Sequence, residues 1–221
     1  MTTKFYIIRH CEAEGNVKRI FQGSSDLDIS ELGAKQLEFL GKRFESVDVD
    51  VVYSSPLTRA KKTAHAIADR KGMEVKVFEG LREVCGGVID GKPIAESFKK
   101  YPHLAEAWDN HPQDFAPDCG EPMRDAYERI WAAVSEIVKE NKGKNIVATA
   151  HGGVIRCLMC RLLYQDISRL KDVPWAENTA ITLIEFQDDL SYKIVFSNNH
   201  LHVPEKYLPK RSRISSLMKG E

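Results

Sequence analysis

Cationic and imidazole side chains stand at three points of the sequence close behind an apolar run. They are the pair Arg9-His10, Arg59 and His151. A guanidinium offers a planar fork of N–H donors that matches the oxygens of an anion, and imidazole adds a further hydrogen-bonding group. If the apolar runs are strands of one sheet, these side chains meet at its carboxyl edge, where open α/β sheets bind ligands. The spacing therefore indicates an anion site.

Strand and helix patterns alternate along the chain, as they do in proteins built on a parallel sheet. Short apolar or alternating runs predict strands at 5–8, 49–53, 74–78 and 145–150, and periodic segments predict helices at 31–44, 58–71, 124–140 and after Gly153. Two further runs, 179–186 and 192–196, flank an acidic turn and predict an antiparallel hairpin. We therefore expect an α/β fold, a three-layer α/β/α sandwich with a mostly parallel sheet and an antiparallel edge hairpin.

The length of 221 residues favours a single domain that spans residues 1–221. Between about 84 and 122, five prolines and scattered aromatic residues weaken the periodicity. A connection of that length is more often functional than idle, so we expect an excursion of short helices that covers the site. From about Pro204 the chain continues as a basic tail, and the sequence leaves open whether this tail folds over the site.

The charge balance argues for a small-molecule partner. Thirty-two basic and 32 acidic residues cancel, so no long-range field attracts nucleic acid or a membrane surface. The sequence shows no apolar targeting segment and no stretch long enough to span a bilayer, and its five scattered cysteines fit a reducing compartment. We expect a cytoplasmic protein that acts on a small phosphorylated metabolite, without nucleic acid or membrane. A homodimer is left open.

Several motifs, taken together and in order, resemble those of the histidine phosphatase superfamily, in its phosphoglycerate mutase-like branch. The motifs are Arg9-His10-x-Glu12, Gln22-Gly23, Ser54-Ser55-Pro56-Leu57-x-Arg59-Ala60, Leu81-Arg82-Glu83 and His151-Gly152-Gly153. The resemblance covers nearly the whole chain, and five motifs in the correct order are far more specific than any one of them. The short cover is similar to that of broad-specificity phosphatases and α-ribazole phosphatases.

The resemblance implies hydrolysis of a small phosphomonoester through a phosphohistidine intermediate. His10 would be the nucleophile, Arg9, Arg59 and His151 would bind the phosphoryl oxygens, and Glu83 would protonate the leaving alkoxide. The family position of these cations implies that neither a metal nor another cofactor is needed, because the side chains neutralise the phosphate. Because His10 must be neutral while Glu83 holds its proton, the rate should peak at mildly acidic pH.

The resemblance and the cover also assign substrate-binding residues. Positions in the polar loop after the first strand and at the start of the last long helix would contact the phosphoryl group. Aromatic residues of the cover would select the leaving group. The residues are Asn16, Gln22, Gly23, Gly152, Trp108 and Phe115.

Two alternatives stay open at this point. Mutases of the superfamily carry an Arg and a Tyr directly after the acid, whereas here Glu83 is followed by Val84 and Cys85, which favours hydrolysis over mutase activity. A non-catalytic phosphate-binding module is the second alternative. It is suggested only by Cys11, which stands where the family usually has Gly. That thiol would crowd the floor of the pocket or respond to oxidants.

Overall fold

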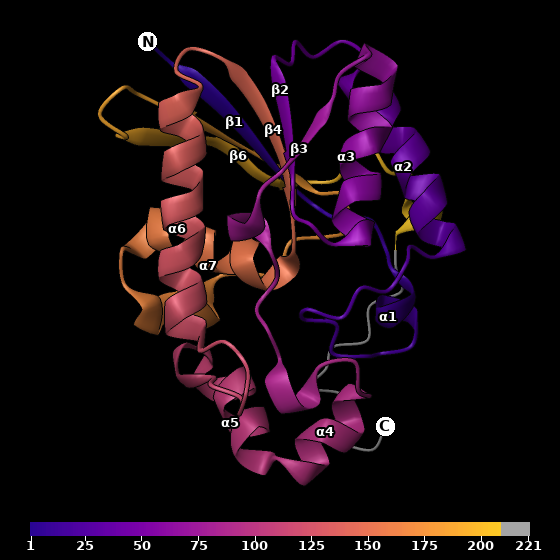
Figure 1. Ribbon diagram of the computed structural model, residues 1–221, viewed down its shortest axis with the longest axis vertical. Helices are drawn as coiled ribbons and strands as arrows, with labels where there is room; N and C mark the ends of the chain where they lie inside the picture. Colours follow the sequence, from indigo (N-terminus) through magenta and orange to yellow (C-terminus); the bar gives the residue numbers. More distant parts are fainter. Residues whose placement is uncertain (209–221) are drawn as a thin grey trace.

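A computed structural model describes residues 1–208 and contains one six-stranded sheet with helices on both faces (Figure 1). The strands are β1 (Thr3–Arg9), β2 (Val51–Ser54), β3 (Val75–Val77), β4 (Asn145–Ala150), β5 (Ile181–Phe186) and β6 (Tyr192–Asn199), in the order β3-β2-β4-β1-β5-β6. The first four strands are parallel, and β5 pairs antiparallel with both β1 and β6. The predicted mostly parallel sheet with an antiparallel edge hairpin is confirmed.

The predicted long helices are also present. The α-helices are α1 (Glu14–Val17), α2 (Glu31–Phe44), α3 (Thr58–Lys71), α4 (Ile94–Lys100), α5 (Pro102–Asn110), α6 (Met123–Glu140) and α7 (Gly152–Tyr164). Short 3-10 helices add η1 (Glu79–Leu81), η2 (Gly87–Ile89), η3 (Pro112–Asp114), η4 (Ile167–Asp172) and η5 (Glu205–Tyr207). The sequence pattern missed α1, because a single turn closed by the Asn16 side chain on the Ala13 N–H is too short to show periodicity. None of these helices is long and apolar enough to cross a membrane.

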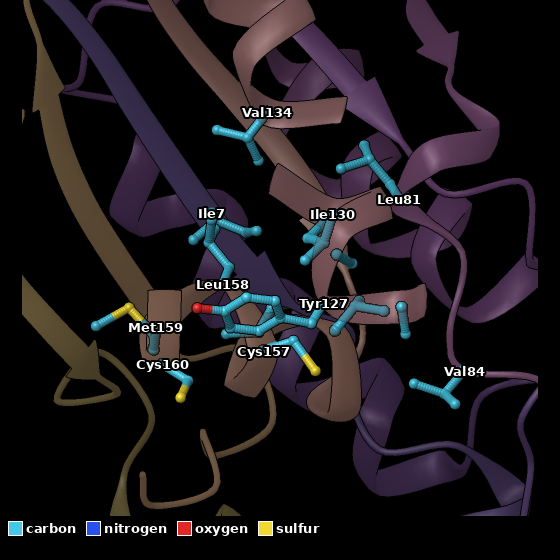
Figure 2. Packing of buried hydrophobic residues seen from close by; sticks show 14 of the residues in the cluster. Ile7, Leu81, Val84, Tyr127, Ile130, Val134, Cys157, Leu158, Met159 and Cys160 are labelled. Carbon is cyan, nitrogen blue, oxygen red and sulfur yellow. The ribbon is translucent and has the colours of Figure 1, made fainter. Parts of the chain in front are cut away.

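Alternation along β1 divides the core between the two faces of the sheet. Phe5 and Ile7 are buried with residues of α6 and α7, whereas Ile8 is buried on the other face with residues of α2 and α3. Figure 2 shows Ile7 close to Ile130 and Tyr127 of α6 and to Leu158 of α7. Both faces of β1 are therefore covered by helices, and the strand ends at Arg9, directly before His10.

The excursion between Glu83 and Met123 contains η2, α4, α5 and η3. Figure 1 places α4 and α5 beyond the end of the sheet that lies opposite the N-terminus, on the same side as α1. Phe21 links this cover to the loop after α1, because its N–H donates to Lys92 O at 3.0 Å and its C=O accepts from Gly91 N at 2.9 Å. The cover is thus paired with the loop that follows β1.

The start of the predicted basic tail lies against α2. The side-chain amide of Gln36 donates to Tyr207 O at 3.0 Å, and the Tyr207 ring lies 5.3 Å from that of Phe39. The rest of the predicted tail, after Leu208, lies outside the residues that the structure describes.

Candidate active site

His10 follows the last residue of β1 and is held by backbone bonds on both sides. Its N–H donates to Ala150 O at 2.9 Å, and its C=O accepts from the Asn178 side chain at 2.9 Å. Within the ring, Nδ1 lies 2.6 Å from Cys11 O. A carbonyl oxygen can only accept, so Nδ1 carries a proton in this contact and Nε2 keeps its lone pair. Among residues 1–208, no group hydrogen-bonds to Nε2.

The His10 ring lies beside that of His151, the residue that precedes α7. The ring centroids are 5.2 Å apart, and both side chains are buried. Burial lowers the pKa of His10 well below its usual value, and the charges of Arg59 and Arg9 lower it further. Burial likewise lowers the pKa of His151, assisted by Arg59. Both imidazoles are therefore neutral at physiological pH.

Ser55 fixes one side of the His151 ring. The hydroxyl lies 2.7 Å from His151 Nε2, and it also accepts the Leu57 N–H at 3.3 Å. A hydroxyl that accepts from the backbone is well placed to donate to Nε2, which leaves the proton of His151 on Nδ1. Nδ1 is buried and has no partner among the residues that the structure describes. It is therefore available as a donor to a ligand.

Arg59, in the first turn of α3, is 1% exposed. Its two terminal nitrogens donate to Ser25 O at 2.8 Å and to Gly23 O at 2.9 Å. The guanidinium thus orders the loop after α1 while it stays close enough to His10 to lower the pKa of that imidazole. Burial also lowers the pKa of Arg59, although an arginine remains charged at any physiological pH.

Gly23 is required by its backbone and by a close neighbour. Its φ is +41°, and a Cβ there would lie 2.1 Å from Asp90 Oδ1. The Asp90 carboxylate accepts the N–H groups of Ser24 and Gly86, so it connects the loop after α1 to the cover. The structure therefore gives Gly23 a packing role beside the predicted substrate contact.

Arg9 and Gly152 lie together at the start of α7. Arg9 donates from Nη1 to Ala176 O at 2.6 Å, and a Cβ on Gly152 would lie 3.3 Å from Arg9 Nε. The same Cβ would lie 3.1 Å from the Trp175 ring. Gly152 thus lets the backbone of α7 approach both side chains, and the structure brings Arg9, His10, Arg59 and His151 to one end of the sheet, as predicted.

Glu83 lies across the first turn of α7. Its Oε2 accepts the Gly153 N–H at 2.9 Å, and its Oε1 accepts the N–H groups of Val154 at 3.1 Å and Val84 at 2.9 Å. Backbone donors at a helix N-terminus are free to bind such a carboxylate. The Glu83 carboxylate is thereby bonded directly to the first turn of α7, the helix that begins after His151.

Asn16 and Gln22 lie in the loop around α1. Asn16 Oδ1 accepts the Ala13 N–H at 2.9 Å, which points the amide nitrogen away from that turn. Gln22 packs against Gly15, where a Cβ would lie 2.3 Å from its side chain. Gly15 thus leaves the space that the Gln22 side chain occupies.

The two predicted aromatic residues of the cover differ in their position. Trp108 is half-buried and stacks on Trp175, with ring centroids 5.5 Å apart and an angle of 29°. Phe115 is fully buried behind it, against Phe21 and Trp108 at 5.8 and 5.0 Å. Direct contact of Phe115 with a substrate does not fit this burial, because the neighbouring rings already cover it. Phe115 supports the wall that Trp108 forms.

Cys11 does not occupy the pocket floor. Its side chain is fully buried toward α2 and α3, where a Cβ on Gly33 would lie 3.2 Å from Sγ and Thr63 hydrogen-bonds to the Cys11 N–H. Burial raises the pKa of the thiol to about 12. The expectation that Cys11 crowds the pocket or meets oxidants is therefore wrong, because the thiol is protonated and enclosed.

Sequence reasoning missed Trp175 and the contact of Ser55 with His151. Trp175 lies in an irregular segment after η4, and Arg156 of α7 lies with its Cζ 5.0 Å from the ring centroid. Nothing in the sequence pattern shows that this tryptophan stacks on a residue 67 positions earlier in the chain. Ser55 belongs to the motif at residues 54–60, but only the fold reveals its partner.

Comparison with known proteins decides the family. The family model of the histidine phosphatase superfamily (branch 1) matches residues 5–200. The chain belongs to this superfamily. Phosphoserine phosphatase 1 from Hydrogenobacter thermophilus is 29% identical over 214 residues, which cover 96% of this chain and 99% of the relative. Broad-specificity phosphatase YOR283W from Saccharomyces cerevisiae is 32% identical over 200 residues, 87% of this chain and 83% of the relative.

Solved structures of histidine phosphatases share the fold. Bacillus stearothermophilus YhfR superposes with a TM-score of 0.85 at 29% identity, over 90% of this chain and 99% of that one. The predicted family and enzyme class are thereby confirmed: the protein is a histidine phosphatase, a class that hydrolyses phosphomonoesters through phosphohistidine.

Proposed function

We propose that this histidine phosphatase hydrolyses small phosphomonoesters with His10 as the nucleophile, Arg9, Arg59 and His151 as phosphoryl ligands, and Glu83 as the acid. One observation carries the assignment of His10. Its Nδ1 is bound to Cys11 O, so the lone pair of Nε2 is directed away from the backbone, in a setting that keeps the ring neutral. A neutral imidazole with a fixed tautomer is the form that attacks phosphorus.

The first step forms a bond from His10 Nε2 to phosphorus and breaks the bond from phosphorus to the ester oxygen. Arg59 and Arg9 balance the charge on the phosphoryl oxygens, and His151 Nδ1 donates a hydrogen bond to them. Glu83 gives its proton to the leaving alkoxide. The Glu83 Oε2 atom accepts one backbone N–H, against two at Oε1, so Oε2 is the atom with room for that proton.

The second step regenerates the enzyme. Water attacks the phosphorus of phosphohistidine, the bond to Nε2 breaks, and the Glu83 carboxylate takes the proton of the water. In both steps the side chains on α3, directly before α7 and at the end of β1 supply the positive charge and donors that face the phosphoryl group. The proposed chemistry routes no step through a metal.

The wall formed by Trp108 and Trp175 favours a leaving group that packs against aromatic rings. Phosphoserine is the first substrate to test, because a phosphoserine phosphatase is among the relatives that align over nearly the whole chain. Sugar phosphates, nucleotides and cobalamin-precursor phosphates complete the panel. If Trp108→Ala leaves the relative rates across this panel unchanged, the role of the wall in specificity is wrong.

Hydrolysis of 4-nitrophenyl phosphate in excess chelator tests the proposal. We expect turnover by the parent protein and a loss of at least about 1,000-fold in His10→Ala, the order that removal of a nucleophile produces. No turnover by the parent contradicts the enzyme assignment, and turnover that survives in His10→Ala removes His10 as nucleophile. With 3-phosphoglycerate, release of inorganic phosphate supports a phosphatase, whereas the 2-phospho isomer indicates a mutase.

A cytoplasmic location, action as one domain over residues 1–221 and a homodimer remain predictions. Light scattering after gel filtration distinguishes a monomer of 25.0 kDa from a dimer of twice that mass.

A further inference from the structure

Arg129 of α6 forms four hydrogen bonds in a largely buried position near Glu83. Its Nε and Nη2 donate to the two carboxylate oxygens of Glu121 at 2.6 and 2.7 Å. Its Nη1 donates to Gly80 O at 2.8 Å and to Arg82 O at 2.9 Å. The side chains of Arg129 and Glu121 are only 20% and 15% exposed, so solvent screens this pair weakly.

The pair holds the backbone on both sides of Glu83. Arg129 binds the carbonyl of Arg82, the residue before the acid. The N–H of Glu121 donates at 2.9 Å to the carbonyl of Cys85, two residues after it. Glu83 is therefore bracketed by one ion pair, which is itself anchored on α6.

The surroundings leave this segment few other positions. A Cβ on Gly80 would lie 2.5 Å from the Cβ of Ala133, one turn after Arg129 on α6. Leu81 and Val84 are buried in the same cluster as Ile130 of α6, and Figure 2 shows both side chains pointing from their chain segment toward that cluster. Residues 80–84 thus pack closely against α6, and the bonds of Arg129 to Gly80 O and Arg82 O determine where this segment lies along the helix.

Charge alone does not explain the arrangement. The carboxylate of Glu121 neutralises the guanidinium, so the pair adds little net field at Glu83. The fork geometry of arginine, by contrast, satisfies a carboxylate and two carbonyls at once, which a lysine cannot do. A positional role therefore fits the contacts better than an electrostatic one.

We infer that Arg129 and Glu121 are positioning residues that hold Glu83 where it can protonate the leaving group. The inference rests on the proposed role of Glu83 as the acid. Displacement of the acid matters most when the leaving group is a poor one, because an alkoxide needs its proton and 4-nitrophenolate does not. The ratio of kcat/KM with an alkyl phosphate to kcat/KM with 4-nitrophenyl phosphate therefore reports the position of Glu83.

The test compares Arg129→Lys and Glu121→Gln with the parent on phosphoserine and 4-nitrophenyl phosphate. Glu83→Gln is the reference, and Arg124→Lys is the matched control, because Arg124 lies on the same helix in an exposed pair with Asp114. Rates are divided by the burst of 4-nitrophenol, which counts competent sites, so a smaller folded fraction does not alter them. Arg129→Lys and Glu121→Gln change opposite partners of the ion pair, so the test can still be made if one of the two variants does not fold.

We expect Arg129→Lys and Glu121→Gln to lose about 10-fold or more in kcat/KM with phosphoserine and less than about 3-fold with 4-nitrophenyl phosphate. The comparison uses kcat/KM because it reports the formation of phosphohistidine and excludes the second step, in which Glu83 acts alike for both substrates. Arg124→Lys should match the parent with both, and Arg129→Lys should add no loss to Glu83→Gln. Equal losses on the two substrates, or none, overturn the positioning role. If Glu83→Gln itself shows no dependence on the leaving group, the proposed acid is wrong and the inference falls with it.

Discussion

Substitution of Gly153 by alanine should displace Glu83 and leave the fold intact. Gly153 is the second residue of α7, and its N–H donates to Glu83 Oε2. A Cβ at this position would lie 2.6 Å from Glu83 Oε1, whereas ordinary contacts begin at 3.4 Å. The obstructing atom ends a side chain that can rotate, so the carboxylate moves and the helix stays.

The expected size of the effect follows from that distance. The carboxylate oxygen must retreat by about 0.8 Å, the difference between 2.6 and 3.4 Å. That shift weakens its bonds to Val84 and Val154, which are 2.9 and 3.1 Å long. Misplacement of a catalytic group by about 1 Å costs up to about 100-fold in rate, so we expect a loss of about 30- to 100-fold with an alkyl phosphate. With 4-nitrophenyl phosphate we expect a loss below about 3-fold, where both losses refer to kcat/KM, which excludes the second step.

Folding stability should change little in this variant. Alanine is the better helix former by about 1 kcal/mol, which offsets the loss of about one hydrogen bond. Thermal unfolding followed by circular dichroism should therefore place Gly153→Ala within about 5 °C of the parent, where 1 kcal/mol corresponds to about 2–4 °C in a chain of this size.

The neighbouring glycine provides the contrast. A Cβ on Gly152 meets Trp175 and Arg9 and not Glu83. Gly152→Ala should therefore disturb phosphate binding and reduce the rates with both substrates by a similar factor. Steady-state kinetics with phosphoserine and 4-nitrophenyl phosphate separates the two patterns. A loss in Gly153→Ala that is equal for both leaving groups would refute the reasoning about Glu83.

Three further predictions concern groups near the site and the core. Ser55→Ala should lower kcat by about 10-fold or more, because the His151 tautomer loses its partner and a charge-assisted bond worth about 1.5–3 kcal/mol is weakened; an unchanged rate would contradict the assigned tautomer. Iodoacetamide should label the exposed Cys119 and spare the buried Cys11 of the folded protein, which peptide mass mapping can check; early labelling of Cys11 would contradict its enclosure. Burial lowers the pKa of His202 to about 4. Below pH 6.5 the unfolded chain therefore binds more protons than the folded chain, and folding stability decreases as the pH is lowered. The loss of folding free energy, halved because His202 is partly exposed, is about 0.7 kcal/mol at pH 5.5. His202→Leu should remove this pH-dependent loss in denaturant titrations, and an unchanged dependence of stability on pH would contradict the prediction.

The arrangement of strands and helices could be predicted because its causes are local. The helix at 31–44 has its capping residue Ser30, which accepts the Gly33 N–H, and the strand at 145–150 is mainly apolar, with Thr149 the one polar residue after Asn145. The side of the sheet at which Arg9, His10 and His151 meet follows from the parallel order of the strands. The sequence therefore predicts those parts of the site.

Other parts of the site depend on contacts between distant segments. No sequence pattern indicates that Trp175 stacks on Trp108, or that Phe115 lies behind that wall, because both depend on how the cover packs. The bracket around Glu83 joins α6 to residues more than 40 positions earlier. Cys11 was misjudged for the same reason: its neighbours, Gly33 and Thr63, lie on two helices that follow much later in the chain.

The central claim is that His10 carries the phosphoryl group on Nε2, and rapid quench of the enzyme and a ³²P-labelled substrate in alkaline detergent, in which phosphohistidine is stable, tests it most directly. The trapped label, analysed after alkaline digestion, is predicted to be phosphohistidine substituted on Nε2, located by peptide mapping to His10 and absent from His10→Ala. Label on Nδ1, label on another residue, or turnover without any trapped label would contradict the account.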